Sequence, residues 1–161
     1  MSESRAAAAD TRHRIPYPNS RPRAIKVIGL GEGGSHIADA VAEQSMRHVQ
    51  AIGAGGARGN PAGSEGMLQA IADEGSEIGR AIRGADMVFV VAREGDNVAL
   101  VPAIGQMAHD KGVLVTGVLV QQAAGMNTPN ATLDALRAAC DMLVMVSDAE
   151  YVTEMLGALG A

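Results

Sequence analysis

Five short apolar segments, separated by stretches with helical periodicity, constrain the fold of this chain more than any other feature. Each segment is rich in Val, Ile or Leu and is apolar on both faces, as buried parallel strands are. The predicted strands are residues 25–30, 49–53, 87–92, 113–120 and 142–146, and the predicted helices lie near residues 35–47, 65–83, 99–111 and 128–139. This βαβ repetition predicts an α/β fold with a doubly wound, mostly parallel, Rossmann-like sheet of about five strands and helices on both faces.

Length, charge and composition indicate one folded domain preceded by a basic tail. A chain of 161 residues can bury a core without crosslinks. Residues 1–24 hold five Arg, three Pro and little apolar surface, so we expect a disordered tail, with residues 25–161 forming a single domain. There is no apolar leader or membrane-spanning stretch, and the single cysteine, Cys140, fits a reducing compartment. A cytoplasmic location is therefore predicted.

The first predicted strand runs into a glycine-rich turn that opens a helix. Residues 29–34 read GLGEGG and match G-x-G-x-x-G, a pattern whose backbone N–H groups can bind phosphate at a helix N-terminus. Glu32 places a carboxylate in this cradle. Residues 51–56, at the end of the second strand, read AIGAGG and lack the acidic residue that grips the ribose of a dinucleotide. The pattern alone is therefore weak support for an NAD(P) site.

Four segments together resemble the nucleotide-binding half of the FtsZ/tubulin family. Residues 25–41 (IKVIGLGEGGSHIADAV) resemble that family's IKVIGVGGGGGNAVN, and residues 84–92 (GADMVFVVA) resemble its ADMVFITAGMGGGTGTG. Residues 111–120 (KGVLVTGVLV) and 136–152 (LRAACDMLVMVSDAEYV) resemble its GALTVGVVTKPF and LRxxVDTLIVIPNDRLL. The matches occur in family order and cover residues 25 to about 156. The resemblance implies the N-terminal GTPase domain of FtsZ, in a truncated and degenerate form.

Carried over by position, the resemblance implies a nucleotide pocket that keeps its scaffold and loses much of its chemistry. Glu32 stands where the first phosphate loop has glycine, and His36 where it has asparagine. The GGGTGTG loop is replaced by residues 93–99 (REGDNVA), and of an Asn-Asp pair only Asp148 survives. The candidate nucleotide-binding residues are Gly29, Gly31, Glu32, Gly33, Gly34, Ser35, His36, Arg93, Gly95 and Asp148. No catalytic residue and no metal ligand is assigned.

Three carboxylates follow the ends of neighbouring predicted strands. Glu32, Glu94 and Asp96 are expected to rim one pocket. A carboxylate about 4 Å from a phosphate charge costs on the order of 1 kcal/mol in water and more when partly desolvated, so this pocket is expected to reject a triphosphate unless a cation mediates. A Mg²⁺ or Ca²⁺ site built from these oxygens is the less favoured alternative to a solvated cluster.

Three functions remain, in order of preference. The first is a single-domain FtsZ-like protein with a degenerate nucleotide pocket, acting as a non-hydrolytic binding or assembly partner and expected to be oligomeric. Hydrolysis by the family mechanism is not expected, because the family's catalytic loop lies in a second domain that this sequence lacks. The second is a protein that binds GTP, GDP or another phosphate ligand through the Gly31–Gly34 turn, and the third is an NAD(P)-binding oxidoreductase. The expected partner is another protein or a second copy, and nucleic acid is considered only for the basic tail.

Three side-chain patterns outside the turn also yield expectations. The strand residues Met87, Met142 and Met145 are predicted to be core; Met67, Met107, Met126 and Met155 are candidates for a partner surface, although core is favoured for most of these four. Cys140 is predicted to behave as a small buried apolar residue. The segment 150–159 carries one apolar stripe, with an outer face that could pair with another chain.

Overall fold

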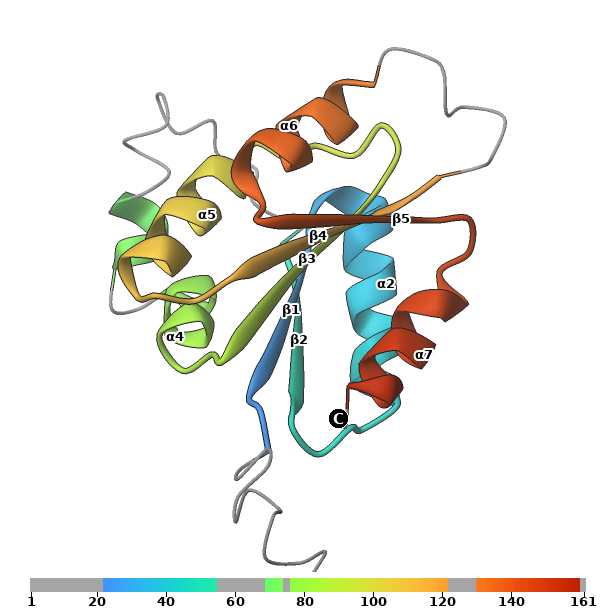
Figure 1. Ribbon diagram of the computed structural model, residues 1–161, viewed down its shortest axis with the longest axis horizontal. Coiled ribbons are helices and arrows are strands. Elements are labelled where there is room, and N and C mark those ends of the chain that lie inside the picture. Colours follow the sequence, from blue (N-terminus) through green and yellow to red (C-terminus); the bar gives the residue numbers. More distant parts are fainter. Residues whose placement is uncertain (1–21, 55–68, 74–75, 122–129, 160–161) are drawn as a thin grey trace, which may run out of the picture.

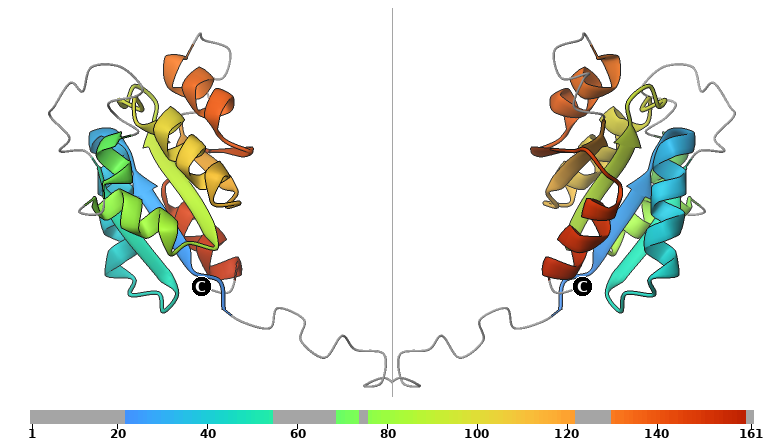
Figure 2. Two further views of the ribbon diagram at one scale, coloured as in Figure 1. Left: turned by 90° about the vertical axis from the view of Figure 1, so that its left-hand side faces the viewer. Right: turned by 90° about the vertical axis from the view of Figure 1, so that its right-hand side faces the viewer.

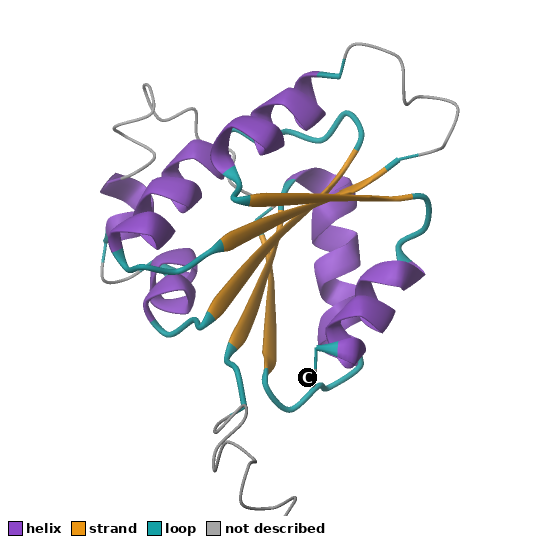
Figure 3. Cartoon of the chain, viewed as in Figure 1, coloured by secondary structure: helices purple, strands orange, loops and turns teal. Residues whose placement is uncertain are grey.

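Five parallel strands form a single sheet in the order β2-β1-β3-β4-β5 (Figures 1 and 3). The computed structural model describes residues 22–54, 69–73, 76–121 and 130–159. The strands are β1 (Ile25–Gly29), β2 (Val49–Gly53), β3 (Met87–Arg93), β4 (Val115–Val120) and β5 (Met142–Val146). The predicted α/β, doubly wound fold class is confirmed, and the sheet is parallel throughout.

Helices cover both faces of the sheet (Figures 1 and 2). One face carries α2 and α7, and the other carries α4, α5 and α6. Their bounds are α2 (Gly31–Glu43), α4 (Glu77–Arg83), α5 (Val101–Asp110), α6 (Ala131–Ala139) and α7 (Glu150–Ala158). No helix in the described ranges is long and apolar enough to cross a bilayer.

Each face of the sheet buries its own apolar cluster. On the first face, Ile37 and Val41 of α2 and Leu156 of α7 pack with strand residues such as Val91 and Val118. On the second face, side chains of the other three helices pack against alternate residues of the same strands, including Ile82, Ile104, Leu136, Ile28, Val90 and Leu119. Because successive strand side chains alternate between faces, strands that are apolar on both faces supply both clusters.

Helix starts differ from the predicted ones, most clearly at three places. The helix predicted from residue 35 begins four residues earlier, at Gly31, inside the glycine turn. The segment predicted as one helix from 65 to 83 contains a second start at α4, where Ser76 caps the helix by accepting a hydrogen bond from the Gly79 N–H. α6 begins after Asn130, whereas the predicted start at residue 128 lies outside the described residues.

The methionine prediction is wrong at two positions. Met142 and Met145 of β5 are exposed, although they were predicted to be core, whereas Met107 of α5 is buried, as was favoured for most of the other methionines. The reason is position in the sheet, because β5 is an edge strand that, among the described residues, has a neighbouring strand on one side only. Met87 and Met155 are half-buried, and Met67 and Met126 lie outside the described residues.

Candidate functional site

The glycine turn lies where the strand order of the sheet reverses. The connection after β1 leads through α2 on one face, and the connection after β3 leads through α5 on the other, so the chain leaves the carboxyl ends of these adjacent strands in opposite directions. The turn is attached to β3 by a hydrogen bond of 2.9 Å from the Leu30 N–H to the Val91 carbonyl. The residues that follow β3 therefore face the first turn of α2.

The Asp96 carboxylate occupies the anion position of this turn. The Gly33 N–H donates to Asp96 Oδ1 at 3.1 Å, and the Gly34 N–H donates to Oδ2 at 2.8 Å. A third donor, the Arg93 N–H, reaches the same Oδ2 at 2.7 Å. A bound phosphate would need the same N–H groups at the start of α2, and here the chain's own carboxylate holds them.

The sequence at the start of α2 explains why this acceptor comes from elsewhere. Leu30 stands at the N-cap position and has no side-chain oxygen, so it makes no capping hydrogen bond. The first turn of a helix leaves N–H groups without partners inside the helix, and an acceptor is required. A carboxylate is also favoured there by the helix dipole. Asp96 supplies the acceptor and its negative charge, although it lies 62 residues from Gly34 along the chain.

The glycines of the turn permit its close contacts. Gly31 has φ +68°, and a Cβ at this position would lie 2.6 Å from the Cβ of Asp96. A Cβ on Gly33 would meet the Arg93 side chain at 2.6 Å, and one on Gly34 would meet the Val91 carbonyl oxygen at 2.3 Å. These glycines therefore admit the segment after β3 and the strand itself, in addition to exposing N–H groups.

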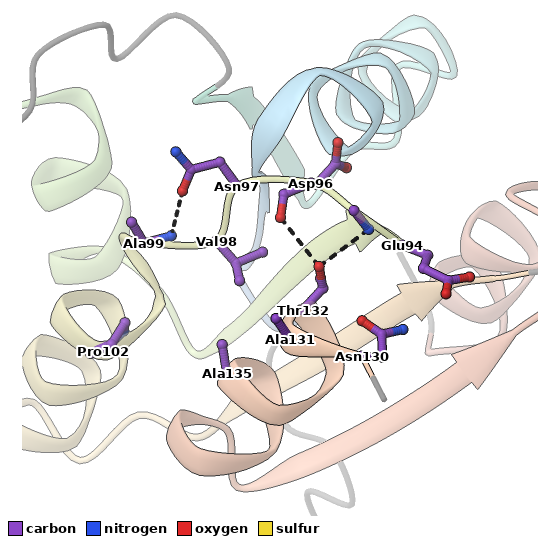
Figure 4. A pocket seen from close by; sticks show the side chains of 11 residues that line it. Glu94, Asp96, Asn97, Val98, Ala99, Pro102, Asn130, Ala131, Thr132 and Ala135 are labelled. Atoms are coloured by element: carbon purple, nitrogen blue, oxygen red, sulfur yellow. Dashed lines mark hydrogen bonds between the residues drawn. The ribbon is translucent and has the colours of Figure 1, made fainter. Parts of the chain in front are cut away.

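The loop after β3 that carries Asp96 is itself held in place by α6. Gly95 has φ +86°, and the Asp96 N–H donates to the Arg93 carbonyl at 3.0 Å, which closes a tight turn. The buried Thr132 hydroxyl accepts from the Gly95 N–H at 3.2 Å and donates to the Asp96 carbonyl at 3.3 Å (Figure 4). In the same view the Asp96 carboxylate points toward α2 and away from Thr132.

A cavity of about 550 Å³ lies between this loop and the start of α6. The buried Asn130 side chain caps α6 by accepting from the Leu133 N–H at 3.1 Å, and its amide donates to Gln121 Oε1 at 3.4 Å. Within the described part of the chain, every buried side-chain nitrogen and oxygen has a hydrogen-bond partner. The cavity's buried polar side chains are therefore used to hold the loop and the helix.

The structure brings together some of the predicted site residues and separates others. The turn unites Gly29, Gly31, Gly33, Gly34, Arg93 and Gly95, and the Ser35 hydroxyl bonds to the Gly29 carbonyl at 3.4 Å. Glu32 and His36 are exposed on α2. Asp148 follows β5, which β4 separates from β3, and accepts from the Glu150 N–H at 3.0 Å.

The expectation of a three-carboxylate pocket is wrong in its arrangement. Glu94 and Asp96 line the cavity beside α6, but Glu32 is not among its lining residues, and the carboxylate of Asp96 is engaged by the α2 turn. Across the ranges that the structure describes, no group of three or more His, Cys, Asp or Glu side chains is arranged to hold a metal ion. Asp96, Thr132 and Asn130 are the residues whose roles the sequence did not reveal.

A second polar cluster lies at the opposite, amino end of the sheet. Asp141 Oδ2 accepts from the Val115 N–H at 2.8 Å, and Oδ1 lies 2.8 Å from His109 Nε2. The Val115 hydrogen bond, with help from His109, lowers the pKa of Asp141. Burial, with a smaller effect of the Asp141 charge, raises the pKa of Cys140 to about 11. Cys140 is half-buried against Gly117, and its raised pKa supports the prediction of an inert thiol.

Comparison of the sequence with models of known protein families finds no match.

Proposed function

We propose that this protein is a non-hydrolytic binding or assembly module of FtsZ-like architecture, in which Asp96 acts as an internal substitute for the nucleotide phosphate. The observation that carries the proposal is the Asp96 carboxylate on the N–H groups of Gly33, Gly34 and Arg93. The glycine turn then serves to join β1, α2 and the β3 loop into one rigid unit.

The energetics favour the internal anion over an external one. Hydrogen bonds to a charged group contribute about 1.5–3 kcal/mol each, so a phosphate that displaced Asp96 would first have to replace three of them. The displaced carboxylate would also remain on a short loop held by Thr132, where its charge repels the phosphate. An external phosphate therefore gains little binding free energy by displacing Asp96 from the turn.

The same site offers little to a base or a ribose. Phe89, one of the two aromatic residues in the described ranges, is buried in the sheet core, and the other, Tyr151, lies on α7. A stacking platform beside the turn is therefore missing from those ranges. The FtsZ-like part of the proposal rests on the sequence resemblance, and the parallel sheet with a glycine turn at the reversal of strand order is shared by doubly wound folds in general.

Binding of GTP, GDP or another phosphate ligand is the second candidate. It is favoured by the convergence of three N–H groups on one anion position and by the Arg93 side chain, which lies against Gly33 and adds a cation. In this alternative, ligand binding expels Asp96 and rearranges residues 93–99. An NAD(P)-dependent oxidoreductase is the third candidate, and the glycine pattern remains its sole support.

The test compares Asp96→Ala with the wild-type chain and with Glu94→Ala, which removes a neighbouring carboxylate that does not bond to the turn. Unfolding is followed with and without inorganic phosphate and GTP. We expect no stabilisation of the wild type or of Glu94→Ala, and stabilisation of Asp96→Ala by phosphate, because its turn lacks an anion. Asp96→Asn, which keeps one acceptor oxygen, serves if Asp96→Ala folds poorly. Wild-type stabilisation by GTP equal to that of Asp96→Ala would overturn the proposal.

A further inference from the structure

The thioether of Met145 is exposed at the edge of the sheet. Met145 lies on β5 and is 44% exposed, so a small oxidant in solution can reach its sulfur. Successive side chains of a strand point to opposite faces. Leu143 packs against the apolar cluster on the face that carries α4, α5 and α6, so Met145, two residues further on, lies on that face as well. Met142 and Val144 lie on the other face, where both line a groove beside α7.

The Met145 sulfur also accepts a hydrogen bond from a buried amide. The Gln121 side chain is 6% exposed, and its Nε2 donates to Met145 Sδ at 3.7 Å. A thioether sulfur is a weak acceptor. Gln121 Oε1 accepts from Asn130 Nδ2 at 3.4 Å, which is long for an N–H···O bond. Two weak bonds therefore position the Gln121 amide, and one of them ends on an atom that can be oxidised.

Asn130 connects this pair of bonds to the loop that carries Asp96. Its buried side chain caps α6 by accepting from the Leu133 N–H at 3.1 Å. Thr132, close to it in the first turn of α6, bonds to the Gly95 N–H and to the Asp96 carbonyl (Figure 4). A continuous series of contacts thus leads from the exposed sulfur to the loop whose carboxylate binds the glycine turn.

We propose that Met145 is an oxidation site through which hydrogen peroxide loosens the Asp96 loop; this regulation rests on the proposed role of Asp96 in the turn. The sulfur attacks one peroxide oxygen, and the S–O bond forms as the O–O bond breaks. The proton of the transferred oxygen passes to the departing hydroxide, which leaves as water. The sulfur is thereby oxidised by two electrons to the sulfoxide, and methionine sulfoxide reductases reverse the change.

Both epimers of the sulfoxide displace the Gln121 amide. An oxygen on the side of the sulfur that faces Gln121 lies closer to Nε2 than a hydrogen bond permits, so the amide is pushed aside. An oxygen on the solvent side draws electron density from the sulfur, which then no longer accepts the N–H. In each case Gln121 Oε1 moves with its amide, and the buried Asn130 loses this acceptor. The cap of α6 is then weakened, and with it the contacts of Thr132 with the loop.

The test is hydrogen exchange of the full chain before and after treatment with hydrogen peroxide, with the sulfoxide at each methionine quantified by mass spectrometry. The Leu133 amide reports on the cap of α6, and the Gly95 amide reports on the contact with Thr132. We expect exchange at both amides to become about fivefold faster once Met145 is converted, as for a weakened helix cap. Methionine sulfoxide reductases should restore the original rates.

Two variants assign the response to one sulfur. Met145→Leu removes the sulfur and nearly keeps the side-chain volume, so peroxide should leave exchange at Leu133 unchanged, although the other methionines are still oxidised. Met142→Leu is the matched control, because it removes the other exposed methionine of β5 and should keep the full response. Complete conversion of Met145 without faster exchange would overturn the inference. A response that persists in Met145→Leu or disappears in Met142→Leu would overturn it too, as would a Met145 that resists peroxide while Met142 is converted.

The measurements separate this inference from the proposed function. Unchanged exchange after conversion of Met145, in a chain that remains indifferent to GTP and phosphate, overturns the oxidation site alone. Stabilisation of the unoxidised chain by GTP, with the exchange response intact, overturns the proposed function alone.

Discussion

At the residue scale, the turn works through matched pairs of small and charged residues. Gly31 and Gly33 leave room for Asp96 and Arg93, and Asp96 supplies the acceptor that Leu30 cannot. Each partner is useful only with the other in place, because a side chain on the glycines would push the loop away from the N–H groups. The turn thus keeps the geometry of a phosphate-binding site, but the anion that it binds is the chain's own Asp96 carboxylate.

Gly34→Ala tests the close approach of α2 to β3. The added Cβ would lie 2.3 Å from the Val91 carbonyl oxygen, which is backbone and cannot move aside, so we expect destabilisation of about 2–4 kcal/mol. The matched control is Gly157→Ala in α7, where a Cβ meets nothing within 4 Å and the helix should gain about 0.5–1 kcal/mol. Urea unfolding measures both. Equal effects of the two substitutions would contradict the described packing.

Cys140 should react slowly with alkylating reagents. Its pKa of about 11, against an ordinary value of 9.0, leaves about a hundredfold less thiolate at pH 8 than an unperturbed thiol has. Iodoacetamide labelling of the folded protein should accelerate as the pH rises toward 11, and unfolding in urea should remove the protection. Folding stability linked to this thiol is fully present below pH 9 and is lost as the pH rises through 11. Labelling of the folded chain at the rate of the unfolded chain would refute this assignment.

At the element scale, α6 holds the loop that carries Asp96. Asn130 caps the helix, and Thr132, two residues later in its first turn, bonds to both Gly95 and Asp96. The start of α6 is therefore as much a part of the site as the start of α2. Any change that frays α6 should loosen the acceptor of the glycine turn.

Asn130→Ala should cost about 1–2 kcal/mol, because it removes the cap of α6 and leaves a buried Gln121 with one partner fewer. The control, Asn97→Ala, removes an exposed residue whose side chain accepts from the Ala99 N–H at 3.0 Å, and should cost less than about 1 kcal/mol. Thermal unfolding compares them, and hydrogen exchange at the Gly33 and Gly34 amides should increase in the first variant only. If exchange there is unchanged in Asn130→Ala, α6 does not support the turn.

Most elements were predictable from the sequence because their signals are local. β2 and β5 have the predicted bounds, and β1 and β3 differ by one residue at their ends. The exposure of Met142 and Met145 was not predictable, because an edge strand and a central strand can carry the same apolar pattern. The glycine turn was found, but its occupant was not. Asp96 lies 62 residues from Gly34, and only the fold brings them together.

At the scale of the whole molecule, the two ends of the sheet have different roles. The carboxyl end holds the turn whose N–H groups Asp96 binds, and the amino end holds the Asp141 cluster and an apolar groove lined by residues that include Leu114, Met142 and Leu159. At the carboxyl end the anion position is already occupied by Asp96, and at the amino end an apolar groove is open. Both features are consistent with the proposed function as a binding module.

The most direct test of the account is a thermal-shift panel on the wild-type chain with GTP, GDP, ATP, NAD(H) and NADP(H), each with and without Mg²⁺. A ligand at about 100 times its Kd stabilises a native protein by about 2.7 kcal/mol, which is readily detected for one domain. The account predicts no shift with any of them, because Asp96 already holds the N–H groups of the turn. A selective shift with one nucleotide, lost in Gly34→Asp but not in Gly157→Ala, would contradict it.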